Sequence, residues 1–352
     1  MAPAAAAAVC DTPQGHRWTV TTREGVNVIK NWISGASFGA IALAHLASGA
    51  LAADKPVYAV LMKTLSNQFF IAATKGIDEG AKKAEVDVIL AAGEPGQSAE
   101  TQVSACETML ERKPAVMIAA AINSTILLPC LKDFNEMKIP VVDFDDNLDP
   151  ETIRKAGVEV AFHIGSDNEA AGAMGADYLV SVLGKDANGP VLVIEGLSGN
   201  VTGQKRARGF ASELRRRAPG LDIVASLPGD WDSLKAADIA NDTLERNPDL
   251  IAIFCANDDM ALGAVEAARS KGKDKVVVIG VDGTQSALKS IRAGRLNASV
   301  AQLPYLMGMR AIEDSKMALS GEKLPEFVDV PTLVLTREVI EANKEPMLQY
   351  VK

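Results

Sequence analysis

Short runs of consecutive apolar residues alternate with amphipathic stretches along nearly all of the chain after residue 55. The run KVVVIGV (275–281) is apolar at successive positions, which is typical of a strand covered on both faces. The apolar runs predict strands at 57–63, 86–92, 115–121, 139–145, 159–165, 190–195, 221–226, 250–256, 275–281 and 298–302. Apolar residues at helical spacing between them predict helices at 69–84, 97–112, 125–137, 168–183, 203–217, 232–247, 259–271 and 304–320.

This strand–helix rhythm runs twice along the chain. AVMIAAAIN (115–123) followed by IPVVDFDD (139–146) is echoed by LIAIFCAND (250–258) followed by KVVVIGVDG (275–283). In each half, one strand ends near an asparagine and the next ends in aspartate. A single open sheet of all these strands would be unusually wide. The pattern therefore predicts an α/β protein of two similar doubly wound units, each a parallel sheet covered by helices.

The N-terminal region has the organisation of a secretory signal. In VNVIKNWISGASFGAIALAHLASGALAADKP (26–56), one lysine precedes an uncharged apolar stretch that ends in the small-residue site ALA at 50–52. The apolar stretch is short and rich in small residues, unlike a membrane anchor. We expect cleavage after Ala52 and a periplasmic protein; a buried alanine-rich helix is the alternative. Residues 1–25 precede the signal, which suggests that translation begins near Val26.

The charge balance argues against a nucleic-acid partner. The chain has 45 acidic and 36 basic residues, for a net charge of −9. Its densest basic segment, KRARGFASELRRR (205–217), has helical spacing and is typical of a solvated helix face rather than of a phosphate-binding patch. We therefore expect no nucleic acid among the partners of this protein.

Three cysteines lie beyond the expected signal, at Cys106, Cys130 and Cys255. Each lies inside an apolar periodic segment, and no pair has the C-x-x-C spacing. This favours buried thiols over metal ligands or a disulfide framework. Because the number is odd, at least one thiol is expected to stay free in an oxidising compartment.

No catalytic or cofactor-binding constellation is evident. The only histidine beyond residue 52 is His163, inside a predicted strand, where a satisfied core histidine is a simpler interpretation than a catalytic one. GLSGNVTGQK (196–205) lacks the Gly-Lys-Ser/Thr of a P-loop, and there is no G-x-G-x-x-G. DFDD (143–146) could collect a hard cation, but no metal-ligand spacing supports it. We expect neither an enzyme nor a cofactor or metal.

Polar residues gather instead at the predicted carboxyl ends of strands, where open α/β sheets bind ligands. They are Lys63, Asn67, Asp145, Asp146, Asn257, Asp258 and Asp282. Carboxylates and amides hold vicinal hydroxyls, and aromatic faces cover the C–H surface of a sugar ring. KTLSNQFF (63–70) adds Phe69 and Phe70 side by side in a chain with only 5% aromatic residues. Taken singly, each residue is equally well explained as a helix N-cap or a core aromatic.

The sequence resembles the periplasmic sugar-binding proteins of the ribose and D-allose type over nearly all of 55–336. The segments that carry the resemblance, in family order and spacing, are KTLSNQFF, IPVVDFDDN, IGSDNEAAG, IEGLSGNVTGQKRARGF, LPGDWDSLKAADIANDTLERNPDLIAIFCANDDMALGA, VVVIGVDGT and ASVAQLP. The resemblance implies a periplasmic binding protein type I fold, with two lobes joined by a three-strand hinge around a ligand cleft. The implied first lobe is 54–166 with 303–331, and the second is 167–302 with 332–344, after an upstream segment and signal at 1–52.

By motif, the resemblance also implies a set of ligand-binding residues. They are Lys63, Asn67, Phe69, Phe70, Asp145, Asp146, Arg206, Trp231, Asn257, Asp282 and Gln302. Phe69 and Phe70 would cover one ring face, and Trp231 would face them from the other lobe. Gln68, Asp143 and Asp146 depart from the family pattern, which leaves the identity of the sugar open.

The function implied by the resemblance is the periplasmic substrate-binding component of a sugar ABC transporter, acting as a monomer without a cofactor. The implied ligand is a monosaccharide, with D-allose or D-allulose before D-ribose. The implied partner is a membrane permease, with a chemoreceptor as a further one. Two alternatives stay open at this point: a polyol- or inositol-binding protein of the same family, and the ligand-binding core of a lactose-repressor-type regulator. That second branch carries an N-terminal helix-turn-helix, where this chain has the signal-like segment.

Overall fold

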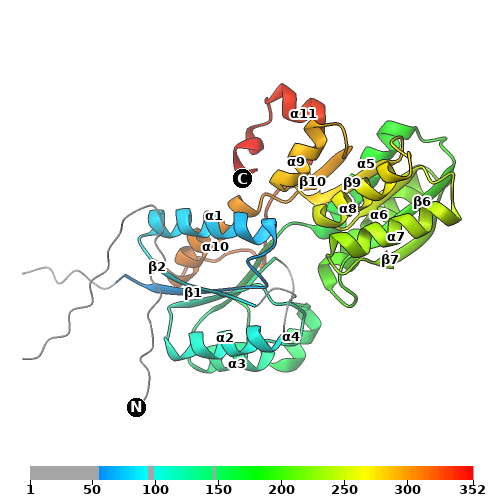
Figure 1. Cartoon of the computed structure of the whole chain (residues 1–352). Coiled ribbons are helices and arrows are strands. Elements are labelled where there is room, and N and C mark those ends of the chain that lie inside the picture. The colour runs from blue at the N-terminus through cyan, green and yellow to red at the C-terminus, as the bar shows by residue number, and fades with distance from the viewer. Residues whose placement is uncertain (1–54, 94–98, 146–147, 352) are drawn as a thin grey trace, which may run out of the picture. The chain divides into compact units, whose positions relative to one another are not determined.

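The structure is a computed structural model that describes residues 55–93, 99–145 and 148–351. The expected signal and its cleavage site after Ala52 lie outside these residues. Two six-stranded sheets form the centres of two units, which we call the first and the second lobe (Figure 1). No helix in the three described ranges is long and apolar enough to cross a bilayer.

The first sheet has the strand order β11-β5-β4-β3-β1-β2, and its pairings are parallel. Its strands are β1 (Val57–Met62), β2 (Asp87–Ala92), β3 (Val116–Ala119), β4 (Val141–Phe144), β5 (Phe162–Gly165) and β11 (Phe327–Asp329). One face is covered by α1 (Gln68–Ala84) and α10 (Pro304–Leu319), and the other by α2 (Ala99–Glu111), α3 (Leu128–Glu136) and α4 (Pro150–Ala156), as Figure 1 shows. Because helices cover both faces, the strands are apolar at successive positions.

The second sheet repeats this arrangement, with the order β12-β10-β9-β8-β6-β7. Its strands are β6 (Gly189–Glu195), β7 (Leu221–Pro228), β8 (Ala252–Cys255), β9 (Val277–Asp282), β10 (Ala298–Ala301) and β12 (Leu333–Leu335). Helices α5 (Asn168–Leu183) and α6 (Val201–Arg217) pack on one face, whereas α7 (Ser233–Arg246), α8 (Asp258–Ser270) and α9 (Gln285–Arg292) pack on the other. The equal order of the two sheets is the physical basis of the repeated pattern in the sequence.

Glycines allow the covering helices to approach each other closely. A Cβ at Gly76 of α1 would lie 1.9 Å from the carbonyl oxygen of Tyr305 in α10. In the second lobe, a Cβ at Gly172 of α5 would lie 2.0 Å from the carbonyl oxygen of Arg206 in α6. A larger residue at either glycine would push the pair of helices apart. The packing of α5 on α6 therefore also determines where Arg206 lies.

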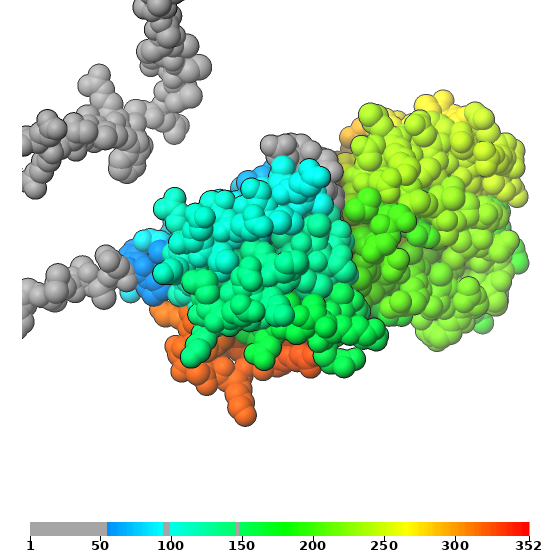
Figure 2. All heavy atoms as spheres, turned by 90° about the horizontal axis from the view of Figure 1, so that it is seen from below, coloured from blue at the N-terminus to red at the C-terminus, as the bar shows by residue number. Residues whose placement is uncertain are grey.

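The chain passes from one sheet to the other through 166–167, 302–303 and 330–332. α10 and β11 lie between β10 and β12 of the second sheet in sequence but belong to the first lobe, where β11 pairs with β5. In Figure 2, atoms of this returning segment, coloured orange, lie against green and cyan atoms of the first lobe. The two lobes are thus joined by several short crossings rather than by one linker.

The long elements agree with the periodicity of the sequence, whereas several short ones were not predicted. β11 and β12 have three residues each, and β12 pairs antiparallel with β10 in a sheet that was expected to be parallel throughout. α9, α4 and α11 (Arg337–Ala342) were also missed. A strand of three residues, or a helix of about two turns, is too short to show a hydrophobic period.

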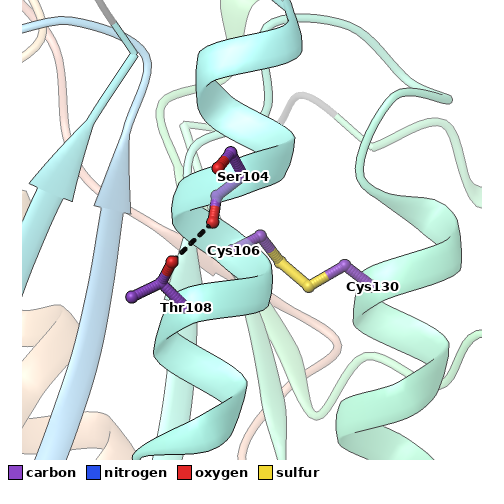
Figure 3. The surroundings of a disulfide bond; sticks show 4 residues. All are labelled: Ser104, Cys106, Thr108 and Cys130. Carbon is purple, nitrogen blue, oxygen red and sulfur yellow. Dashed lines mark hydrogen bonds between the residues drawn. A yellow bond between two sulfur atoms is a disulfide. The ribbon is translucent and has the colours of Figure 1, made fainter.

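The expectation that all three cysteines are buried thiols is wrong for two of them. Cys106 of α2 and Cys130 of α3 form a disulfide bond that joins these neighbouring helices (Figure 3). Both residues are buried, as expected, in a cluster with Met109, Leu131 and Phe134. The predicted burial did not indicate the disulfide bond, because apolar periodicity places each cysteine on the buried face of a helix but does not show that the two faces are in contact. Cys255 at the end of β8 is a free thiol, and burial raises its pKa well above the usual value.

Candidate ligand-binding site

A pocket lies between the lobes at the carboxyl ends of the strands of both sheets. Its volume is about 420 Å³, including the space that opens to solvent. Residues after β1 and β4 and at the start of α1 line it on the side of the first lobe. On the other side it is lined by residues of α6, by residues after β7, β8 and β10, and by the last residue of β9. The lining residues are Lys63, Thr64, Asn67, Phe69, Phe70, Asp145, Thr202, Arg206, Trp231, Asn257, Asp282 and Gln302.

An ion pair lies in the wall of the first lobe. Lys63 follows β1 and Asp145 follows β4, and Lys63 Nζ lies 3.1 Å from Asp145 Oδ2. Both side chains are less than a tenth exposed. Lys63 Nζ also lies 5.7 Å from the ring centroid of Phe70, within the range of a cation–π contact. The pair therefore presents both signs of charge to the pocket next to an aromatic face.

The two adjacent aromatic residues belong to the first turn of α1. Phe69 and Phe70 are both buried, with ring centroids 5.1 Å apart and an edge-to-face angle of 80°. Asn67 precedes them as the N-cap of α1, because its Oδ1 accepts from the backbone N–H of Phe69. Asn67 Nδ2 donates to Asp259 Oδ2 in the second lobe at 3.0 Å. Asn67 is thus both a helix cap and a part of the pocket wall.

The wall of the second lobe is organised by a buried arginine. Arg206 Nε donates to Asn168 Oδ1 at 2.8 Å, and Nη1 donates to the carbonyl oxygen of Ala256 at 2.7 Å and to Asp282 Oδ1 at 3.1 Å. Gln302 Nε2 donates to the same Asp282 oxygen at 2.7 Å. Burial raises the pKa of Asp282 well above its usual value, and the charge of Arg206 opposes that rise.

Gln302 leaves one acceptor atom available in this wall. Its side chain is fully buried, and no described residue donates to its Oε1. A buried acceptor without a donor costs free energy. A hydroxyl group that donated to Oε1 would remove that cost.

Trp231 supplies an aromatic face from the second lobe. It lies in a turn with φ +62° and is half-buried. Its ring packs against Gly196 and Gly203, and the guanidinium carbon of Arg206 lies 5.9 Å from the ring centroid. Because the turn and the two glycines hold the indole, its orientation is determined before any ligand binds.

Buried carboxylates behind the wall hold the turn after β9. Asp258 is fully buried, outside the pocket lining, and accepts from the backbone N–H of Thr284 at 2.7 Å and from Ser299 Oγ at 2.6 Å. Ser299 Oγ in turn accepts from the backbone N–H of Gly283 at 3.0 Å. Burial raises the pKa of Asp258 to about 7, although these hydrogen bonds oppose the rise. The network therefore positions Asp282, which directly precedes the turn.

The predicted residues come together in this pocket with one exception. Asp146 lies outside the described residues, and every other residue of the predicted set lines the pocket. Sequence reasoning missed Thr64 and Thr202, which also line it. Thr64 directly follows Lys63 at the end of β1, so its position at a strand end was an available signal. His163 lies below the pocket in β5, where its Nδ1 is 2.8 Å from Asp143 Oδ2.

The lining chemistry fits a small polyhydroxylated ligand. It combines carboxylates, amides, two cationic side chains, hydroxyls and three aromatic rings. Such groups hydrogen-bond hydroxyls and cover the C–H faces of a ring. In the described part of the chain, no three histidine, cysteine, aspartate or glutamate side chains are grouped in a way that could hold a metal ion.

Comparisons with known proteins agree with this picture. Residues 58–323 match the family described as the periplasmic binding protein domain. The D-allose-binding periplasmic protein of Escherichia coli (strain K12) is 36% identical over 299 residues, which cover 83% of this chain and 95% of that protein. The ribose import binding protein RbsB of Bacillus subtilis (strain 168) is 32% identical over 277 residues, covering 79% and 86%.

A solved structure gives the same result for the fold. It is an ABC transporter periplasmic solute binding protein from Actinobacillus succinogenes 130z with bound D-allose. Its TM-score is 0.77 at 32% identity, over 82% of this chain and 100% of that one. The expected fold class of two doubly wound, parallel-sheet α/β lobes is therefore confirmed.

Proposed function

The chain belongs to the periplasmic binding protein domain family, and on that premise we propose that it binds a monosaccharide between its lobes for a sugar ABC transporter. The observation that carries the proposal is the pocket wall. Charged groups, amides and aromatic rings from the carboxyl ends of both sheets converge there, with Gln302 Oε1 as a buried acceptor that awaits a donor. We propose that the chain is a transport component and not an enzyme.

Each predicted site residue has a proposed task. Phe69, Phe70 and Trp231 cover the apolar faces of the sugar ring. The hydroxyl groups of the sugar form hydrogen bonds with charged and amide side chains. The hydrogen bonds to charged side chains give the larger share of the affinity. The charged and amide side chains are Lys63, Asn67, Asp145, Asp146, Arg206, Asn257, Asp282 and Gln302. Thr64 and Thr202, which are both buried, add hydroxyl groups to the same set.

For the identity of the sugar, we propose D-allose or D-allulose first and D-ribose next, with a polyol or inositol behind them. The D-allose-binding relative at 36% identity and the D-allose-bound neighbour at 32% identity support this order. The acidic position Asp146, where the ribose pattern has an arginine, supports it independently.

A thermal-shift screen of monosaccharides and polyols tests the proposal. A ligand that binds only the folded protein raises the melting temperature, by an amount that grows with the logarithm of its concentration relative to Kd. We expect a shift with neutral aldoses or ketoses. Shifts confined to amino acids, nucleosides or sugar phosphates would contradict the proposal, and turnover of any bound sugar would point to an enzyme instead.

The lobes are proposed to open and close about the crossings. The proposed first lobe is 54–166 with 303–331, and the second is 167–302 with 332–344. Hinge bending at short crossings leaves each core intact. Small-angle scattering should then show a smaller radius of gyration at saturation with the identified sugar. An unchanged radius would count against closure.

Export and partners complete the proposal. We propose cleavage after Ala52, a monomer in the periplasm, and a membrane permease as the partner, with a chemoreceptor as a further one. The D-allose-binding relative and the D-allose-bound neighbour are periplasmic proteins by name, which supports this compartment. N-terminal sequencing of protein from the periplasm should begin Ala53-Asp54-Lys55. A cytoplasmic protein that retains residue 1 would contradict both export and the transport role.

A further inference from the structure

One pair of side-chain contacts crosses between the lobes without lining the pocket. Gln68 is the first residue of α1 in the first lobe, and Ser286 is the second residue of α9 in the second lobe. Gln68 Nε2 donates to Ser286 Oγ at 2.8 Å, and the backbone N–H of Ser286 donates to Gln68 Oε1 at 3.2 Å. The glutamine amide thus uses both its donor and its acceptor on one residue of the opposite lobe.

Gln68 accepts from a backbone N–H in the first turn of α9, where N–H groups have no acceptor within the helix. In α9, Thr284 is the N-cap and its Oγ1 accepts from the backbone N–H of Ala287 at 3.2 Å. The neighbouring N–H, of Ser286, is accepted by Gln68 instead. The first lobe therefore completes the capping of a helix in the second lobe.

The contact is separate from the ligand pocket. Neither Gln68 nor Ser286 lines it, whereas Asn67, which also reaches the second lobe through Asp259, does. Both Gln68 and Ser286 are half-buried, so each can be hydrated when the lobes separate. Opening then exchanges protein hydrogen bonds for water at modest cost. Such a contact is suited to a reversible closure.

We propose that Gln68 and Ser286 form a latch that stabilises the closed form irrespective of which sugar is bound. This inference rests on the proposed function in one respect: the affinity measurements detect closure through the binding of a sugar. A group that contacts no ligand atom cannot distinguish between ligands, but it changes the population of the form that binds them. The apparent affinity for every ligand then changes by the same factor.

The test compares Gln68→Ala, Gln68→Asn and Ser286→Ala with the unchanged protein. Gln68→Asn keeps the amide but shortens the side chain by one methylene group, so it should lose the contact as Gln68→Ala does. Thr74→Ala is the matched control, because Thr74 lies on the same helix and its hydroxyl bonds only within α1, to the carbonyl oxygen of Ile71. Dissociation constants are measured by calorimetry for a tight and a weak sugar from the thermal-shift screen, and release rates by stopped flow.

We expect each latch variant to weaken both sugars by the same factor, about threefold to tenfold, mostly through faster release. The double variant Gln68→Ala/Ser286→Ala should be no weaker than Gln68→Ala alone, because Gln68→Ala already removes both hydrogen bonds, whereas Ser286→Ala removes only the one to Oγ. Wild-type affinity in the Gln68 variants would overturn the latch. Unequal factors for the two sugars would also overturn it, since they would place Gln68 in the ligand site.

A second measurement does not rest on differences in sugar affinity. Hydrogen exchange at the backbone amide of Ser286 reports the bond to Gln68 Oε1 directly. At saturation with sugar, where the lobes are closed, Gln68→Ala should exchange faster at this amide than the unchanged protein does, while Thr74→Ala should not. Equal exchange in all three would refute the latch. The two failures are distinguishable: the proposed function fails if no sugar binds the unchanged protein, whereas the latch alone fails if sugar binds and exchange at Ser286 is equal in all three proteins.

Discussion

The indole of Trp231 lies directly on Gly196. A Cβ at Gly196 would come within 2.2 Å of Cη2 and Cζ2 of the ring, and one at Gly203 within 3.1 Å of Cη2. The two glycines therefore form the seat of the indole, and the turn at Asp230 and Trp231, with φ of 54° and 62°, directs the ring onto it. An aromatic face of the pocket thus depends on the absence of two side chains.

Gly196→Ala should displace the indole and weaken ligand binding. Gly196 does not have a positive φ, so alanine is allowed by the backbone, and the clash falls on the ring alone. We expect an affinity loss of about tenfold or more, with a changed tryptophan emission before ligand is added. Ser198→Ala, in the same loop and exposed, is the control and should leave both unchanged. Wild-type affinity in the glycine variant would mean that the seat does not matter.

Trp231→Ala should cost about 2 kcal/mol or more of binding free energy, as for other buried aromatic anchors. Trp231 is the only tryptophan after residue 52, so the fluorescence of protein beginning at Ala53 reports on the site alone. Emission of the unchanged protein should shift in intensity or wavelength at saturation, because the ligand replaces water around the ring. The variant should unfold at nearly the same denaturant concentration. Unchanged affinity would remove Trp231 from the site.

Removing the disulfide should destabilise the protein without affecting the ligand site. Cys106 and Cys130 are separated by 24 residues, and a loop of that length gives a stabilisation of about 3 kcal/mol. Cys106→Ala/Cys130→Ala should lose this amount in denaturant unfolding. Cys255→Ala, which removes a buried free sulfur, is the control.

Treatment with a reducing agent distinguishes the effect of losing the disulfide bond from the effect of losing the packing of two sulfur atoms. It should lower the stability of the unchanged protein and leave the double variant unaffected. The cysteine pair packs in a cluster apart from Phe69 and Phe70, so sugar affinity should stay the same in all forms. A fall in affinity on reduction would contradict this separation.

Asp258 should make stability fall as pH rises toward neutrality. Its folded pKa is raised to about 7, against 3.8 as its ordinary value. Between these values the folded chain holds a proton that the unfolded chain has lost. This stabilisation is complete below the pKa that Asp258 has in the unfolded chain, and it is lost as pH rises through the pKa that Asp258 has in the folded chain. The free energy of unfolding changes by about 4 kcal/mol over this range.

Asp258→Asn, which cannot ionise, isolates this contribution. Unfolding free energies of both proteins are measured by urea titration at about pH 4 and about pH 8. Relative to the unchanged protein, the variant should become more stable at the higher pH. Equal pH dependence of the two would show that Asp258 is charged in the folded protein.

Much of the fold and of the pocket follows from local patterns. Parallel strands end at one edge of a sheet, so polar residues after apolar runs, such as Lys63, Asp145 and Asp282, had to gather there. Helix capping is equally local: Asn67 was interpreted as a possible cap and is one, whereas α4 is capped by Asp149 rather than by Asp145. The repeated rhythm predicted two lobes because each sheet is assembled in the same order.

The sequence alone determined which elements form and which residues stand at their ends. Only the tertiary structure decided which of those ends meet. Nothing local pairs Cys106 with Cys130, seats Trp231 on Gly196, or brings Gln68 to Ser286, a residue 218 positions away. Hydrophobic periodicity indicates whether a side chain faces the core, but it does not indicate which residue that side chain contacts there. These contacts depend on how helices pack and how lobes approach, which is set by the summed packing of both cores rather than by any segment.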